Sequence, residues 1–178
     1  MTGIGGLEKA SWELNGTKDK VDEIRRLVST LYNYYVPPFK VQTYPIPEDA
    51  IKGTVVGITQ KASGGEWLRL DGTYYTASLD DFKKIISWDW TNLKKYVSDT
   101  FDCDKFALYF KSRIALDFKI NAVAVVLDYS SEHAYNLIIY REGEGFNWIL
   151  YEPQNDSMFY FEQRDTNFYK MEDYILLL

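Results

Sequence analysis

The sequence has few of the residues that most often carry covalent chemistry. Among its 178 residues there is one cysteine, Cys103, and one histidine, His133. A single cysteine cannot form an intrachain disulfide, which is typical of a protein in a reducing compartment. No cluster of lysine and arginine stands out, and the formal net charge is −6. We therefore expect no nucleic-acid partner, because a phosphate backbone is bound by concentrated positive charge.

Long apolar runs are missing as well. The longest candidate, residues 120–127, has the length of a strand, whereas a membrane span needs roughly 18–20 apolar residues. The first fifteen residues contain Glu8, Lys9 and Glu13 and no apolar core, so we expect no secretory signal. These absences predict a soluble protein without a membrane partner. Its location is cytoplasmic by default, or a virion or host cell if the protein is viral.

Aromatic residues, in contrast, are plentiful: fifteen Tyr, ten Phe and five Trp. With 46% hydrophobic residues the chain can bury a sizeable core, so a disordered chain is not expected. The length fits one domain. We expect a Gly-rich, irregular arm over residues 1–16 and a single domain over residues 17–178. The first part of this domain is expected to be helical and the second part an antiparallel sheet.

Periodicity and turn residues predict the order of elements. Apolar residues at helical spacing indicate a helix over 18–35, ended by Pro37 and Pro38. Alternation and β-branched residues indicate a strand over 53–59, followed by short strands over 66–70 and 73–76. Ser78 is expected to cap a further helix, and another helix should run from Asp102 to about Leu116. Strands then follow over 122–127, 134–140, 146–151 and 158–161, with a hairpin turn at 143–145. Together these elements predict the α+β class.

Three side chains on these predicted elements, Cys103, His133 and Glu152, could carry thiol chemistry. Cys103 lies at the N-terminal end of a predicted helix, where exposed N–H groups and the helix dipole favour the thiolate. His133 opens a predicted strand and could take the thiol proton. Glu152 ends the adjoining strand, and an antiparallel hairpin would bring it beside the imidazole. This layout predicts a papain-like or transglutaminase-like fold, in which a nucleophile helix packs on an antiparallel sheet.

Other roles for these and neighbouring residues remain open. A lone cysteine is more often a small buried hydrophobe. Residues that could replace Glu152 as the orienting group are Asn155 and Asp156. Residues that could complete an oxyanion hole are Asn92, Gln42 and Gln60. Candidates for substrate binding are Gln154, Trp88 and Trp90, although the two tryptophans could equally pack in the core.

The words Asp-Cys-Asp-Lys-Phe-Ala at 102–107, His-Ala-Tyr-Asn-Leu at 133–137 and Tyr-Glu-Pro-Gln at 151–154 occur in this order. Together they resemble the papain-like C-terminal domain of the Marasmius oreades agglutinin and its bacterial and viral relatives, over roughly residues 88–156. The resemblance implies Cys103 as nucleophile, His133 as base and Glu152 as third member. It also implies a calcium-dependent cysteine endopeptidase. Asp102 and Asp104 are candidate calcium ligands, because carboxylate oxygens suit this cation.

The expected function is therefore a cysteine hydrolase that cleaves a peptide or isopeptide bond through an acyl-enzyme. Its partners would be a peptide or protein substrate and a second copy in a homodimer, with no organic cofactor. The alternative is a non-catalytic binding or structural module, viral or at a cell surface, that retains the fold. The agglutinin's sugar-binding β-trefoil is not expected, because the chain is too short to hold both domains and has no threefold repeat.

Overall fold

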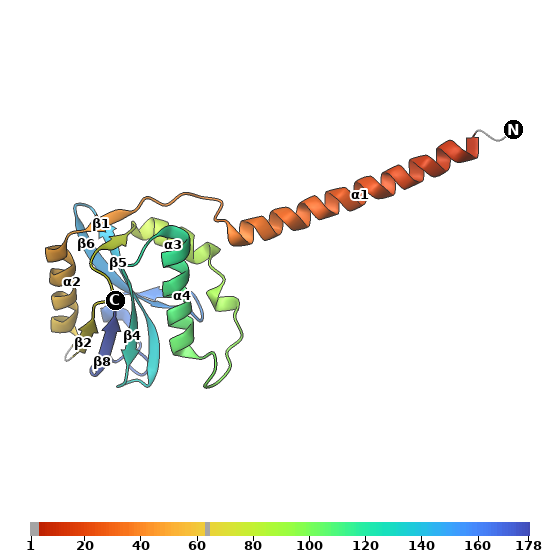
Figure 1. Cartoon of the computed structure of the whole chain (residues 1–178). Coiled ribbons are helices and arrows are strands. Elements are labelled where there is room, and N and C mark those ends of the chain that lie inside the picture. The colour runs from red at the N-terminus through yellow and green to blue at the C-terminus, as the bar shows by residue number, and fades with distance from the viewer. Residues whose placement is uncertain (1–3, 63–64) are drawn as a thin grey trace. The chain divides into compact units, whose positions relative to one another are not determined.

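Helix α1 (Ile4–Tyr35) and the sheet belong to two separate compact units of the chain, residues 1–40 and 41–178 (Figure 1). We call them the helical unit and the sheet unit. The computed structural model describes the backbone of residues 4–62 and 65–178, and the side chains of residues 16–62 and 65–178. The helix includes the predicted segment 18–35 and begins earlier, so it also covers residues 4–16, for which the sequence indicated an irregular arm.

The sheet unit is built on a mixed sheet of six strands. In chain order these are β2 (Gly65–Leu68), β4 (Val123–Asp128), β5 (His133–Glu142), β6 (Gly145–Glu152), β7 (Ser157–Phe159) and β8 (Tyr174–Leu177). Their order in the sheet is β2-β8-β4-β5-β6-β7. Neighbouring strands are antiparallel except β2 and β8, which run parallel. The purely antiparallel sheet predicted from the sequence is therefore wrong. A separate antiparallel pair joins β1 (Tyr44–Ile46) to β3 (Tyr74–Thr76).

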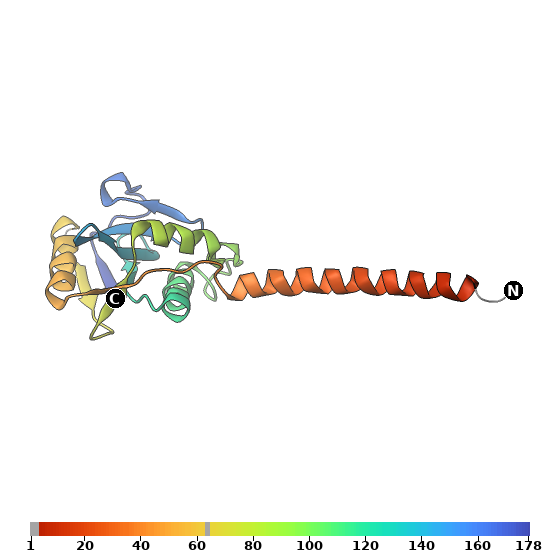
Figure 2. The ribbon, with the colours of Figure 1, turned by 90° about the horizontal axis from the view of Figure 1, so that it is seen from above.

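Helices cover both faces of the sheet. Helix α2 (Glu48–Lys61) packs on one face and α4 (Cys103–Phe118) on the other (Figures 1 and 2). Successive side chains of β5 point to opposite faces of the sheet. Leu137 and Ile139 enter the core under α2, whereas Asn136 contacts α4. Since β5 is covered on both sides, seven of its ten residues are buried. Helix α3 (Leu79–Trp88) also contacts β5, and the single turns η1 (Thr91–Leu93) and η2 (Phe161–Gln163) lie in the connections.

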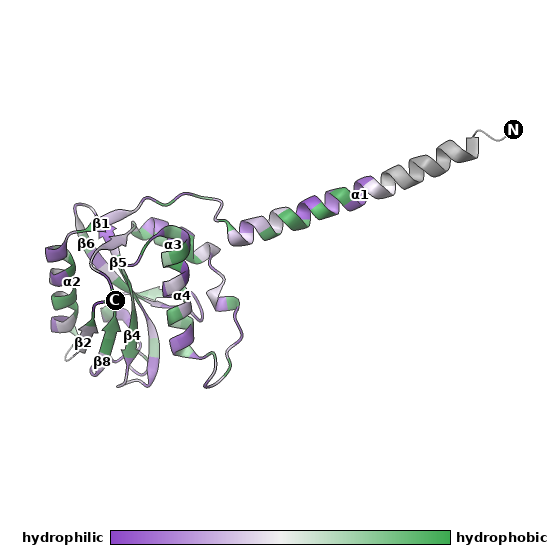
Figure 3. Cartoon of the chain, in the orientation of Figure 1, coloured by the Kyte–Doolittle hydropathy of each residue, from purple (hydrophilic) through white to green (hydrophobic). Residues whose placement is uncertain are grey.

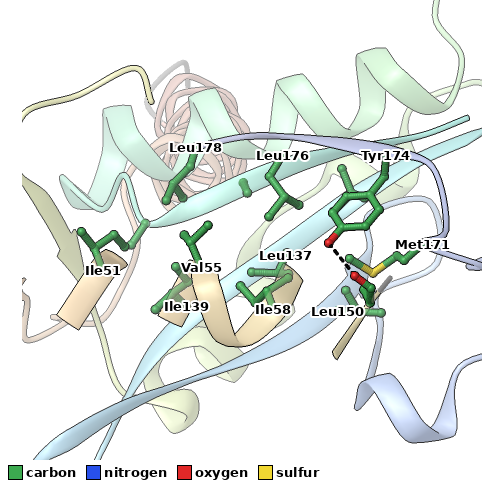
Figure 4. Close-up of a cluster of buried hydrophobic side chains, with 14 of the residues drawn as sticks. Ile51, Val55, Ile58, Leu137, Ile139, Leu150, Met171, Tyr174, Leu176 and Leu178 are labelled. Carbon is green, nitrogen blue, oxygen red and sulfur yellow. Dashed lines mark hydrogen bonds between the residues drawn. The ribbon is translucent and has the colours of Figure 1, made fainter. Parts of the chain in front are cut away.

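The predicted strand over 53–59 is wrong, because these residues belong to α2. Its buried residues Ile51, Val55 and Ile58 recur at helical spacing and pack on the sheet (Figure 4). β-Branched residues such as Val55 favour a strand locally, but burial of this apolar face decides for the helix. The core that α2 covers also contains strand and C-terminal residues: Leu137, Ile139, Leu150, Met171, Tyr174, Leu176 and Leu178.

Several of the remaining elements agree with the sequence, but no strand was predicted where β1 lies. Ser78 caps α3, since its Oγ accepts a hydrogen bond of 3.1 Å from the Asp81 backbone N–H. The predicted strands over 122–127, 134–140 and 146–151 are confirmed as β4, β5 and β6. Strand β8 went unpredicted and lies in the apolar C-terminus. None of the helices in the described residues combines the length and the apolar character that crossing a bilayer requires.

Gly65 allows a close approach between the two parallel strands. It pairs with Tyr174, whose ring occupies the space where a side chain on residue 65 would lie. The Tyr174 hydroxyl donates to the Ala62 carbonyl over 3.4 Å, which holds the ring in place (Figure 4). Only a residue without a Cβ fits here without displacing the ring.

We expect Gly65→Ala to lower the free energy of unfolding by about 1–3 kcal/mol, because the added methyl group overpacks against Tyr174. Urea denaturation measures this change. The matched control is Gly57→Ala in α2, where a Cβ meets nothing within 4 Å and alanine favours the helix. The control is expected to raise stability. Equal stability of Gly65→Ala and the wild type would show that the ring does not pack on Gly65 in solution.

Candidate functional site

The side chains of Cys103, His133 and Glu152 lie together in the sheet unit. Cys103 is the first residue of α4, His133 the first of β5 and Glu152 the last of β6. Strands β5 and β6 form an antiparallel hairpin in which Asn136 faces Tyr151, so Glu152 lies at the His133 end. His133 Nε2 is 2.7 Å from Glu152 Oε2, and the Cys103 thiol is hydrogen-bonded to the His133 side chain. The imidazole thus bridges the sulfur and the carboxylate.

Buried Asn136 fixes the helix that carries the cysteine. Its Nδ2 donates to the carbonyl of Ala107 in α4 over 3.0 Å and to the carbonyl of Ala124 in β4 over 3.1 Å. The side chain is fully buried, so these bonds form away from water and are expensive to lose. The asparagine of the His-Ala-Tyr-Asn word therefore links α4 to the sheet. This role of Asn136 was not predicted from the sequence.

Glu152 is buried, and donors surround both of its carboxylate oxygens. Oε1 accepts from the Gln154 backbone N–H over 3.0 Å. Oε2 accepts from the Tyr169 hydroxyl over 3.2 Å in addition to its contact with His133. A buried carboxylate needs such partners to remain charged. Tyr169 was missed in the sequence because it lies in a connection outside the three motif words.

These contacts shift the pKa values of both reactive groups. Burial alone would lower the pKa of His133, but hydrogen bonds with Cys103 and Glu152 outweigh it and raise the pKa to about 9. The hydrogen bond from His133 lowers the pKa of Cys103 below its ordinary value, and a bond from the Ala134 backbone adds to this. Burial and the negative charge of Asp102 act in the opposite direction. Both shifts favour a thiolate beside an imidazolium, which is the nucleophilic form of the sulfur.

A pocket of about 320 Å³ opens beside the sulfur. Its lining residues are Cys103, Leu127, Asp128, Tyr129, Glu132 and His133. Asp128 pairs with His133 across strands β4 and β5, and its buried carboxylate accepts from the Tyr135 hydroxyl over 3.1 Å. Cys103 is partly exposed, so a small ligand can reach it. We call this cavity the Cys103 pocket.

Several residues proposed from the sequence lie outside this pocket. The Gln154 backbone donates to Glu152, but its side chain is not part of the lining. Trp88 packs in the core, with its ring edge-on to Phe118 at a centroid distance of 5.5 Å. Trp90 is exposed and likewise does not line the pocket.

The rival orienting groups bind elsewhere. Asp156 accepts from the Tyr151 hydroxyl over 2.8 Å and from Asn92 Nδ2 over 2.6 Å. Asn155 Oδ1 accepts from the Ser157 backbone N–H over 3.0 Å. Of the three candidates, Glu152 is therefore the one whose side chain contacts the imidazole.

The two candidate calcium ligands are engaged by a lysine. Lys105 Nζ lies 2.8 Å from Asp104 Oδ2 and 3.7 Å from Asp102 Oδ1. Within residues 16–62 and 65–178, no group of three or more His, Cys, Asp or Glu side chains is arranged to hold a metal ion. Calcium prefers six or more oxygen ligands, so these residues do not make a site for it by themselves. The calcium dependence implied by the resemblance stays a prediction.

A second and larger cavity, about 540 Å³, lies between α2 and the β5–β6 hairpin. We call it the hairpin groove. One wall is formed by the start of α2 and its small residues Ala50, Gly53, Thr54 and Gly57, together with Pro47. The other wall is the hairpin: Arg141, Glu144, Gly145, Phe146, Asn147 and Trp148. A Cβ built on Gly53 would meet nothing within 4 Å, so glycine leaves this wall open.

Charged groups surround the aromatic rings of the hairpin groove. The Arg141 guanidinium lies 5.2 Å from the centroid of Phe146 and donates to Glu144 Oε2 over 3.1 Å. Lys61 Nζ lies 5.5 Å from the centroid of Trp148. The groove thus combines apolar ring surface with cations, a carboxylate and an amide. The groove was not predicted from the sequence, because its walls come from segments about ninety residues apart.

The sheet unit thus has helices on both faces of its sheet and two cavities of the size that small ligands occupy. Residues 64–169, more than half of the chain, match the family of ricin-type beta-trefoil lectin C-terminal domains. The chain therefore belongs to this family. The resemblance to the agglutinin-related proteins, inferred from the three motif words, is confirmed.

Two solved structures show the same fold. One is described as a PSL1a–E64 complex, with a TM-score of 0.54 and 22% identity; the match covers 75% of this chain and 51% of that one. The other is a Polyporus squamosus lectin bound to the human-type influenza-binding epitope Neu5Aca2-6Galb1-4GlcNAc, with a TM-score of 0.52 and 23% identity. That match covers 76% of this chain and 49% of the lectin. The chain thus spans about half the length of these lectins. No curated protein sequence matches the chain.

These findings correct three predictions. The papain-like or transglutaminase-like fold is wrong, because the family and the solved neighbours are lectins and the sheet is mixed. The predicted cysteine hydrolase is wrong for the same reason, and with it the expected peptidase activity. The physical source of the error is that a helix-borne cysteine, a strand-borne histidine and an acid on the next strand recur in unrelated proteins. The alternative of a non-catalytic binding module agrees better with the comparisons.

Proposed function

We propose that the sheet unit is a non-catalytic binding module whose ligand is a glycan held in the hairpin groove. The chain belongs to a family of lectin C-terminal domains, which makes a glycan the first class of ligand to test. The observation that carries it is the lining of the groove, where Phe146 and Trp148 lie together with Arg141, Glu144 and Asn147. Its volume, about 540 Å³, lies within the range of about 300–1,000 Å³ that is usual for small-ligand sites.

The chemistry of the groove suits a sugar. A pyranose ring has an apolar face, which packs against aromatic side chains, and a rim of hydroxyl groups, which need hydrogen-bond partners. Phe146 and Trp148 can provide the first, and Glu144 and Asn147 the second. Arg141 adds a cation that could pair with an acidic sugar through charge-assisted hydrogen bonds. One lectin with this fold was solved with a sialylated trisaccharide, which makes that glycan the first probe.

We expect Gly53→Leu to reduce affinity for Neu5Acα2-6Galβ1-4GlcNAc by about tenfold or more, because the new side chain fills the open wall of the groove. Leucine favours the helix, so α2 should remain folded. Isothermal titration calorimetry measures the affinity, with the trisaccharide lacking its sialic acid as a second ligand. Weaker binding of that ligand would support the role of Arg141.

The matched control is Gly72→Leu, at an exposed position outside the groove where a Cβ also meets nothing within 4 Å. This variant is expected to bind like the wild type. Failure of a broad glycan panel to bind, or binding that Gly53→Leu leaves unchanged, would contradict the proposal.

A second binding role is favoured by the Cys103 pocket. A thiolate beside an imidazolium can attack an electrophilic carbon of a ligand, for example in an epoxide. An S–C bond forms as the C–O bond of the ring breaks, the imidazolium gives its proton to the released oxygen, and the opened ligand stays attached to the sulfur. In this role Cys103 is the attachment point, His133 stabilises the thiolate and Glu152 orients the imidazole. One neighbour was solved as a complex with E64, which makes that compound a suitable probe.

A further inference from the structure

Helix α1 carries a regular apolar stripe on its surface. Along the described part, apolar residues recur at alternating steps of three and four: Val21, Ile24, Val28, Leu31 and Tyr35. Their exposed fractions lie between 40% and 66%. Figure 3 shows the same recurrence as green bands between purple ones along the helix. In the sequence the same register continues towards the N-terminus through Leu14, Ala10 and Leu7, with the polar Thr17 between Leu14 and Val21.

This spacing is the heptad repeat of a coiled coil. A step pattern averaging 3.5 residues places every stripe residue at position a or d, facing a partner helix that supercoils to the left. Sustained over three to four heptads, it distinguishes a coiled coil from a helix that lies on a globular core. The residues on the opposite side are charged, as expected for the solvent face: Asp19, Asp22, Glu23 and Arg26.

We propose that α1 forms a coiled coil with the α1 helix of a second copy of this chain. The stripe is complementary to itself, because β-branched Val21 and Val28 at position a alternate with Ile24 and Leu31 at position d. In a symmetric pair of identical helices, each stripe residue packs against stripe residues of the other helix. A partner without this spacing would match only part of the repeat, which runs from Leu7 to Tyr35 with Thr17 as a polar position.

The residues flanking the stripe fit this arrangement. Leu27 and Tyr32, at the neighbouring positions g and e, are also exposed and widen the apolar face. The positive charge of Arg25, at position e, is partly balanced within its own helix, since its guanidinium lies 3.6 Å from Asp22. Repulsion between the two copies is thereby reduced. Burial between two helices also explains how a helix of 32 residues is stabilised, since packing of an apolar face provides most helical stability.

This inference goes beyond glycan binding, but it bears on it. A coiled coil would join at least two sheet units in one assembly. Linked binding sites can hold a multivalent surface more tightly than a single site does, without any new contact.

Sedimentation equilibrium of the full chain at tens of micromolar tests the proposal. We expect a mass at least twice the 20.8 kDa of one chain. The double variant Ile24→Gln/Leu31→Gln removes two stripe residues but keeps good helix formers. It is expected to sediment at 20.8 kDa, with a dissociation constant raised about 100-fold or more, because the apolar area buried between the helices is lost. The matched control, Asp19→Gln/Arg26→Gln, changes the solvent face and should keep the wild-type mass.

Three results would overturn the proposal. The first is a wild-type chain that stays at 20.8 kDa at every concentration. The stripe would then pack within the same chain or against a different partner. The second is a stripe variant that keeps the wild-type mass. The third is a solvent-face control that dissociates as fully as the stripe variant. Because Cys103 belongs to the sheet unit, an unchanged Cys103 alkylation rate in both variants would show that this unit remains folded.

Discussion

Replacing His133 with alanine is expected to slow the alkylation of Cys103 at neutral pH by about tenfold or more. The His133 hydrogen bond is the largest cause of the lowered Cys103 pKa. Without it, burial and the nearby Asp102 raise the pKa again. Each unit of pKa changes the thiolate fraction about tenfold when the pKa lies above the pH. Mass spectrometry after timed exposure to iodoacetamide measures the rate, and E64 is the second probe.

The pH dependence of this reaction follows from the two pKa shifts. The thiolate is lost as the pH falls through the lowered pKa of Cys103, so alkylation should slow in acid. The imidazolium is lost as the pH rises through about 9, the raised pKa of His133. Its stabilising effect on the fold is therefore fully present below the ordinary value of 6.5 and disappears as the pH passes about 9. Between these limits the ion pair persists.

Cys103 is the only thiol in the chain, so Cys103→Ser gives the background of labelling. Glu152→Gln keeps the shape but removes the negative charge, and it should lower the pH at which the imidazolium is lost. A His133→Ala variant that reacts as fast as the wild type would show that the imidazole does not activate the sulfur. Labelling of the wild type only after denaturation would show that the pocket is closed in solution.

Asn136→Asp is expected to lower the free energy of unfolding by about 3–5 kcal/mol at pH 8, more than Gly65→Ala or Asn136→Ala. The new carboxylate would lie, fully buried, against the carbonyl oxygens of Ala107 and Ala124, to which the amide now donates. An uncompensated buried charge destabilises a fold by this order. Desolvation and the two carbonyls would raise the pKa of the new carboxyl above its unfolded value. The loss should therefore be smaller at pH 5, where protonation removes the charge.

Urea denaturation at pH 5 and pH 8 measures both effects. Asn136→Ala is the matched control, because it removes the same hydrogen bonds without adding charge. It is expected to lower stability by about 1–3 kcal/mol, with little difference between the two pH values. Equal losses for both variants at pH 8 would show that the site admits water. Slower Cys103 alkylation in either variant would support the role of Asn136 in placing α4.

The sequence was a good guide wherever local signals agreed with packing. Ser78 ahead of α3, the helical spacing of α4 and the glycines of the β5–β6 turn each predicted the observed element. The words around Cys103, His133 and Glu152 predicted the family. They misled about the activity, because the same order of a cysteine, a histidine and an acid occurs in proteins of different function.

By itself the sequence determined the order of most elements, the family and the heptad stripe of α1, because each depends on residues that are neighbours along the chain. Only the tertiary structure decided that 53–59 is helical, since burial of Ile51, Val55 and Ile58 on the sheet overrides a local strand preference. It also decided that β2 runs parallel to β8, and that α2 and a distant hairpin enclose a groove. Contacts between distant segments leave no periodic signal in the sequence, so packing alone can reveal them.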